Sequence, residues 1–453
     1  MEPLDQLRRL HALRPQRATP EATPAHSSTH SGAANEDRYG DASPSERALE
    51  RLVPGAVVET EVGACYVTSH AYPRQELRGV FALGDLLPRR PGLLAPFHPV
   101  ARLDESPDFA GAVFLDTETT GLGAAPSVYA FMVGVGTYEM IAQPGATVAE
   151  AHYVVRQFFM RSPGEEPALL VALADLLRDR TLMVSFNGRS FDLPLLRTRY
   201  AVNQRYLPRS AHDLPLLQHD APHLDLLLPA RRLWKRRLQS CRLANLENEI
   251  LGLRRGEDDV PGALIPQMYV DYVRSGNARQ MQRVFYHNRE DIVSTAAIAA
   301  QLCHMVEQPH HADSGLMGLD WLGLGASWES AGRSEDAIEA YQRALDGVSD
   351  PGHQRDIFRR LAALLKRLRR WDDAVSTWEL WLSTVPGGDA TPFIELSKHY
   401  EWQARDLAQA EAWTAFGLHT LRTLPAWQRL PGQMGDLEQR LLRIQRKRAA
   451  PRD

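Results

Sequence analysis

Cysteine is scarce in this chain. The 453 residues include three cysteines, Cys65, Cys241 and Cys303, which are scattered and odd in number. Such a set does not form the dense disulfide framework of a small secreted protein, and a reducing compartment such as the cytoplasm is the simplest expectation.

Long apolar segments and nucleotide-binding loops are also missing. No run of eighteen apolar residues occurs, so no membrane-spanning helix and no membrane partner are expected. The N-terminal stretch lacks the apolar region of a secretory signal. No G-x-x-x-x-G-K-[ST] loop is present, so the sequence gives no sign of P-loop chemistry.

A surplus of positive charge is absent as well. The chain has 52 basic and 56 acidic residues, a net charge of −4. Any nucleic acid would therefore have to bind through local basic patches, because the chain as a whole is not a polycation.

Composition divides the chain into segments. Residues 1–46 are rich in alanine, proline, serine, threonine and histidine, which indicates a disordered arm. Residues 47–107 read as a small β-rich region because apolar and polar residues alternate there. We expect a linker at 305–314 and a basic helix and tail at 426–453.

Residues 108–304 alternate between strand-like and helix-like segments. This order predicts an α/β domain with a mixed central sheet flanked by helices. Strands are expected at 112–115, 128–138, 152–158, 181–186 and 223–228, and helices at 165–178, from about 190, and over most of the remainder.

Residues 315–425 lose the strand pattern and gain tryptophans. Three similar segments begin at Ala337, Ala374 and Ala410, with spacings of 37 and 36 residues. Each follows another helical stretch, so the region resembles tetratricopeptide-type repeats, whose usual period is about 34 residues. A plain helical bundle is the alternative. Stacks of such repeats commonly bind a peptide, so a protein partner is possible.

The first chemical motif is Asp116-Thr117-Glu118 at the end of an apolar strand. Side chains two residues apart on a strand share a face, so Asp116 and Glu118 point the same way. Paired carboxylates repel one another unless a cation lies between them, and a divalent metal ion is the natural candidate. A surface loop with the same letters remains the alternative.

Two further motifs contain acidic residues. Asn187-Gly-Arg-Ser-Phe191-Asp192 follows a buried strand, and Asp192 lies in the first turn of a helix, where the helix dipole favours an acid. His287 and Asp291 are four residues apart in a helical segment, so they share a face. Taken singly, these motifs also fit a helix-start aspartate and a solvated His–Asp pair.

Together, in this order, the three motifs resemble those of the DEDD (DnaQ-like) 3′→5′ exonucleases, which have the ribonuclease H-like fold. The resemblance covers about residues 108–304. It implies that Asp116, Glu118, Asp192 and Asp291 are metal ligands and that His287 is the general base. Residues 240–247, DDVPGALIP and YHNREDIVS are similar to the bacterial YprB-type branch, which often carries tetratricopeptide-like C-terminal repeats.

The third motif departs from the family pattern. Family members with histidine place it five residues before the aspartate, and those with tyrosine place tyrosine four before. Here His287 is four residues before Asp291 and Tyr286 is five before. We take His287 as the base because it shares a helical face with Asp291. Glu290 is the second choice as a ligand.

A basic segment between the second and third motifs could grip a phosphate backbone, with Trp234 stacking on a base. The alternative is a solvated helix with a buried tryptophan. The residues expected to contact nucleic acid are Thr119, Asn187, Phe191, Arg231, Arg232, Trp234, Lys235 and Arg236.

The sequence therefore predicts a metal-dependent 3′→5′ exonuclease that uses two divalent ions, Mg²⁺ or Mn²⁺, to hydrolyse phosphodiester bonds, with single-stranded DNA or RNA ends as the expected substrate. One alternative is a non-catalytic nucleic-acid-binding scaffold that recruits a protein partner through its repeats. Another is an endonuclease that uses the same metal site.

Overall fold

The computed structural model describes residues 48–142, 149–256, 258–425 and 432–449. The chain divides into two compact units, one formed by residues up to Ala230 with Ser240–Pro309, and the other by Arg231–Gln239 with the residues from His310 onward. The disordered arm expected at 1–46 lies outside the described residues. All three cysteines are buried thiols, as packing residues would be.

The first unit is built on a seven-stranded sheet with the order β1-β2-β7-β6-β5-β8-β9. Neighbours from β1 to β5 pair antiparallel, whereas β5, β8 and β9 pair parallel. Strands β1 and β2, from the segment 47–107 that was expected to be a small β-rich region, are thus part of the same sheet. The strands are β1 (Ala56–Thr60), β2 (Gly63–Pro73), β5 (Ala112–Thr119), β6 (Ala130–Ile141), β7 (Glu150–Phe159), β8 (Leu182–Ser185) and β9 (His223–Asp225), with β3 (Leu77–Arg78) and β4 (Phe81–Ala82) forming a separate ribbon.

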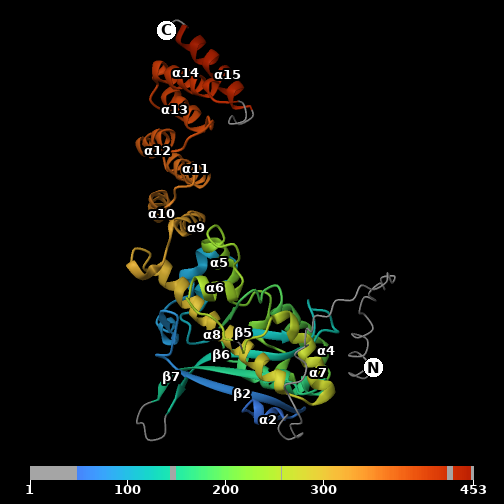
Figure 1. Ribbon diagram of the computed structural model, residues 1–453. Coiled ribbons are helices and arrows are strands. Elements are labelled where there is room, and N and C mark those ends of the chain that lie inside the picture. The colour runs from blue at the N-terminus through green and yellow to red at the C-terminus, as the bar shows by residue number, and fades with distance from the viewer. Residues whose placement is uncertain (1–47, 143–148, 257, 426–431, 450–453) are drawn as a thin grey trace, which may run out of the picture. The chain divides into compact units, whose positions relative to one another are not determined.

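Helices cover the sheet of the first unit (Figure 1). This mixed sheet with flanking helices is the ribonuclease H-like class expected from the sequence. The helices are α2 (Leu49–Leu52), α3 (Glu166–Leu177), α4 (Asp192–Asn203), α5 (Leu227–Trp234), which continues into the second unit, α6 (Leu243–Glu249), α7 (Ile265–Ser275) and α8 (Arg279–Glu307). Short 3-10 helices lie at Leu83–Leu86, Pro91–Phe97, Leu103–Glu105, Pro163–Glu165, Arg209–Ala211, Pro215–Leu217, Gly262–Leu264 and Ala312–Ser314.

The long helix α8 packs across β5, β6 and β7. Two glycines of β6 permit this close approach. A Cβ atom at Gly134 would collide with Asn288 and Ile292, and one at Gly136 would collide with Tyr153 and Ile292. The glycines therefore set how deeply α8 lies on the sheet.

The second unit is all-helical from His310 onward within its described residues, and successive helices pack against one another (Figure 1). Ala337, Ala374 and Ala410 occupy the same position on α10, α12 and α14, and all three are fully buried. The helices are α9 (Gly318–Ser330), α10 (Ser334–Gly347), α11 (Pro351–Arg367), α12 (Trp371–Thr384), α13 (Thr391–Trp402), α14 (Leu407–Thr423) and α15 (Gln433–Ala449).

The turns within the helix pairs share a left-handed residue. Gly332, Arg369 and Arg405 have φ values of 77°, 59° and 55°, and they are again 37 and 36 residues apart. The left-handed conformation costs roughly 1–2 kcal/mol for a residue with a Cβ atom but not for glycine.

Replacing Arg369 by glycine is therefore expected to stabilise the second unit. The free energy of unfolding should rise by about 0.5–1 kcal/mol, once the greater conformational entropy of glycine in the unfolded chain is subtracted from the strain that is relieved. All nine tryptophans lie in the second unit. Urea unfolding of the full chain followed by tryptophan fluorescence thus reports on that unit alone. Arg369→Ala is the matched control and should give no gain, since alanine retains the Cβ atom. A gain from both substitutions would assign the effect to loss of the arginine side chain.

Candidate active site

The carboxyl end of β5 places acidic side chains between two helices. Asp116 Oδ2 accepts a hydrogen bond from Nδ2 of Asn288 on α8 at 2.9 Å. The next residue, Thr117, donates its backbone N–H to Oδ1 of Asp192, at the start of α4, at 3.0 Å, and its hydroxyl donates to the same oxygen. Because adjacent side chains of a strand point to opposite faces, the end of β5 is bonded to α8 through Asp116 and to α4 through Thr117.

A tight turn after β8 brings Asp192 to that point. Asn187 has a φ of 70°, in the left-handed region that asparagine tolerates better than most residues. The carboxylate of Asp225, at the end of β9, accepts the backbone N–H groups of Asn187 at 2.7 Å and Arg189 at 3.1 Å. Asp225 thus holds the turn in place. Asp225 was not among the predicted site residues, although an aspartate inside the strand expected at 223–228 was an available signal, because aspartate is uncommon in strands.

Helix α8 carries the third motif. His287 Nε2 lies 3.7 Å from Oδ2 of Asp291, one helical turn away, as the spacing predicts. Tyr286, the other candidate base, packs its ring beneath the guanidinium of Arg289. Glu290, the second-choice ligand, instead pairs with Arg78 at 2.8 Å.

The four expected carboxylates lie in one another's electrostatic field. Burial raises the pKa of Asp116 well above its usual value, and the charges of Asp291, Asp192 and Glu118 raise it further. Burial, followed by Asp291 and Asp192, likewise raises the pKa of Glu118. Burial raises the pKa of Asp192 to about 6, against the opposing effect of its hydrogen bonds from Thr117. Such a cluster of carboxylates is relieved either by protonation or by a bound cation.

One protein cation already lies in the cluster. The guanidinium of Arg255 binds both carboxylate oxygens of the buried Glu247, at 2.6 and 2.7 Å. It also donates to Oδ1 of Asp291, whose pKa is raised by burial against the opposing effects of His287 and Arg255. Neither Arg255 nor Glu247 was among the residues predicted for the site.

The donor set fits hard divalent cations such as Mg²⁺ and Mn²⁺, which prefer carboxylate oxygens. Among the described residues, however, no three acidic, histidine or cysteine side chains are arranged to hold a metal ion. Hydrogen bonds account for the lack of such a group, because Thr117, Asn288 and Arg255 each bind a carboxylate oxygen of the cluster. Metal binding would require these bonds to be exchanged.

The raised pKa values predict how metal-free stability depends on pH. A carboxyl whose pKa is higher in the folded state binds protons more tightly there, so its contribution to stability is lost as the pH rises. For Asp192 the loss falls between its usual pKa of about 4 and about 6. In chelator, Asp192→Asn is expected to match the wild type near pH 4 and to exceed it by on the order of 2 kcal/mol near pH 7. Urea unfolding followed by circular dichroism measures this. A difference independent of pH would contradict it.

The residues expected to bind nucleic acid fall into two groups. In the first unit, Phe191 is 48% exposed beside Asp192, and the Thr119 hydroxyl donates to the carbonyl of Gly121. In the second unit, Trp234 is completely buried, so the expectation that it stacks on a base is wrong, because a buried indole offers no face to a base. The exposed basic residues around it are Arg231, Arg232, Lys235 and Arg236.

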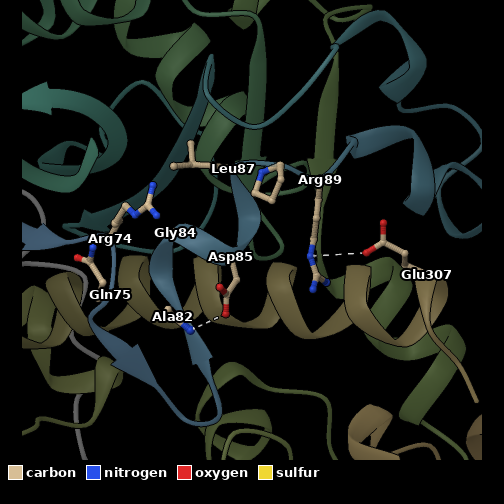
Figure 2. A pocket seen from close by; sticks show the side chains of 9 residues that line it. Arg74, Gln75, Ala82, Gly84, Asp85, Leu87, Arg89 and Glu307 are labelled. Atoms are coloured by element: carbon tan, nitrogen blue, oxygen red, sulfur yellow. Dashed lines mark hydrogen bonds and ion pairs between the residues drawn. The ribbon is translucent and has the colours of Figure 1, made fainter. Parts of the chain in front are cut away.

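A separate hollow of about 780 Å³ lies beside α8 in the first unit (Figure 2). Arg89 and Glu307 face each other across it with a separation of 3.9 Å, and Asp85 accepts the backbone N–H of Ala82. None of the four carboxylates lines it. The hollow is therefore distinct from the candidate active site.

Comparison with known proteins agrees with this architecture. A family model described as the RNase_H superfamily matches residues 113–303, nearly the span expected from the motifs. The chain is also 30% identical over 299 residues to an uncharacterized protein, YprB, of Bacillus subtilis (strain 168). That alignment covers 66% of each chain, just under two thirds. No helix in the described part of the chain has the length and apolar character needed to cross a membrane.

Proposed function

We propose that the first unit, a ribonuclease H-like domain, is a metal-dependent 3′→5′ exonuclease. The observation that carries the proposal is that Glu118, Asp192 and Asp291 all lie close enough to Asp116 to raise its pKa, with His287 one helical turn from Asp291. The match to the ribonuclease H superfamily points to a nuclease in general, and these residues support the finer proposal of an exonuclease.

The four carboxylates would hold two divalent ions, Mg²⁺ or Mn²⁺, which when bound stabilise the charge that develops on the scissile phosphate. His287 accepts a proton from the attacking water through Nε2. The water oxygen bonds to phosphorus, the bond to the 3′ oxygen breaks, and that oxygen takes up a proton. A nucleoside 5′-monophosphate leaves.

Substrate contacts are assigned by exposure and charge. Phe191 offers an exposed ring beside Asp192 on which a terminal base can stack. Thr119 follows Glu118 in the chain, and Asn187 lies five residues before Asp192. Four exposed basic residues of the second unit are suited to contacts with a phosphate backbone, namely Arg231, Arg232, Lys235 and Arg236.

A second candidate function is a nucleic-acid-binding scaffold that does not cut, with the helical unit acting as tetratricopeptide-like repeats that bind a protein partner. One observation favours it. Arg255 already engages Asp291, and no described group is arranged to hold a metal ion. In that case Arg255 permanently takes the place of the cation.

The test is degradation of 5′-labelled single-stranded DNA and RNA by the purified full chain, with Mn²⁺ or Mg²⁺ and with chelator. A ladder that shortens from the 3′ end, and that chelator abolishes, is the expected result and identifies the preferred nucleic acid. Internal cuts would indicate an endonuclease. Binding without cleavage would support the scaffold.

A further inference from the structure

The segment before α7 places an unassigned carboxylate against the candidate base. Asp259 Oδ1 lies 2.6 Å from Nδ1 of His287, the imidazole nitrogen opposite the one that faces Asp291. Both side chains are largely covered, with exposures of 22% for Asp259 and 15% for His287. The short separation is that of a charge-assisted hydrogen bond.

The placement of Asp259 depends on the helix that carries His287. Arg283, one turn before His287 on α8, donates to the backbone carbonyl of Asp258 at 3.2 Å and to that of Asp259 at 2.6 Å. The next residue, Val260, is buried in the core. One face of α8 thus holds the backbone of this segment through Arg283 and its carboxylate through His287.

The chemistry of the neighbours determines which imidazole nitrogen carries the proton. A carboxylate oxygen only accepts, so Nδ1 must donate to Asp259 at this distance. Nη1 of Arg255 also lies 3.3 Å from Nδ1 of His287. The same Nη1 is 3.5 Å from Oδ2 of Asp259, so Oδ2 can accept the hydrogen bond from Arg255 instead. With Nδ1 protonated, neutral His287 has its lone pair on Nε2, the atom directed toward Asp291.

We propose that Asp259 is a positioning residue that fixes the tautomer and orientation of His287, so that Nε2 is the free base at the reaction centre. The inference rests on the proposed function for its consequence, but the tautomer can be tested without any reaction. A partner of this kind orients an imidazole and fixes its tautomer.

The first measurement is the tautomer of His287 in metal-free full-length protein labelled with ¹⁵N-histidine. Long-range ¹H–¹⁵N correlation spectra would be recorded at mildly alkaline pH, where imidazoles are mostly neutral, and the His287 signals would be identified from their loss in His287→Gln. The wild type is expected to carry its proton on Nδ1. Asp259→Ala is expected to shift the population toward the Nε2-protonated form. A proton on Nε2 in the wild type, or an unchanged tautomer in Asp259→Ala, would overturn the proposal.

The second measurement separates positioning from folding through kinetics. Asp259→Ala is expected to lower kcat about 10–100-fold with little change in KM, and Asp259→Asn, which keeps an accepting oxygen, to lose less. The matched control is Asp258→Ala, an exposed neighbour, which should behave as wild type. Equal losses in the alanine and asparagine variants would count against positioning. Absence of nuclease activity in every protein, wild type included, would overturn the proposed function, while the spectra would still decide whether Asp259 orients His287.

Discussion

Replacing Asp116 by asparagine is expected to abolish nucleotide release while making the metal-free protein more stable. Asp291, Asp192 and Glu118 each raise the pKa of Asp116, so its replacement removes a proposed ligand and also this repulsion. Loss of metal-ion stabilisation worth several kcal/mol corresponds to a fall in rate of about three orders of magnitude. Removing a buried, repelled charge should raise the free energy of unfolding in chelator by on the order of 1 kcal/mol.

The two effects are measured separately, the first by the rate at which 5′-labelled oligonucleotides are shortened and the second by urea unfolding. Asparagine keeps an oxygen that can accept from Asn288, so the contact between β5 and α8 survives. Glu290→Gln is the matched control, because Glu290 precedes Asp291 but pairs with Arg78. Full activity in Asp116→Asn would remove Asp116 from the reaction centre.

The largest expected loss of stability comes from Arg199. Its guanidinium binds both oxygens of Glu166, at 2.5 and 2.6 Å, and the two side chains are only 2% and 4% exposed. Arg199→Met leaves Glu166 buried with Asn203 as its remaining side-chain donor. Breaking a buried pair in this way costs about 3–5 kcal/mol. Circular dichroism during urea unfolding measures the loss, because the first unit contains no tryptophan.

A double variant supplies the control for this prediction. Arg199→Met combined with Glu166→Leu removes both charges, and replacing a buried pair by apolar residues is often nearly neutral. The double variant should therefore recover most of the stability lost in Arg199→Met. If it were no more stable than the single variant, the cost would lie in packing rather than in the unpaired carboxylate.

Local patterns were enough to predict much of the fold and the acidic cluster. The alternation of strands and helices over 108–304 gave the mixed sheet, and the D-x-E spacing gave two carboxylates at the end of β5. The i,i+4 spacing placed His287 and Asp291 on one face of α8. These features depend on periods within a single strand or helix, which a sequence displays directly.

Partners from distant segments could not be predicted. Arg255 and Asp259 reach His287 from a loop about 30 residues away, and Asp225 holds a turn 38 residues before it, so no local period connects them. Trp234 was misjudged for a related reason. Basic neighbours suggest exposure, but burial of a side chain depends on what packs against it, and that information is not local.

The two glycines of β6 bear on how relatives of this protein should be judged. Gly134 and Gly136 allow α8 to lie deep enough for Asn288 to reach Asp116 and for Asp291 to join the cluster. A relative with larger residues at these two positions could keep every acidic motif and still hold its ligands too far apart. Counting intact acidic motifs would then overestimate the number of active enzymes among such relatives. The size of the residues at positions 134 and 136 would be a better criterion for activity, although neither residue contacts the substrate.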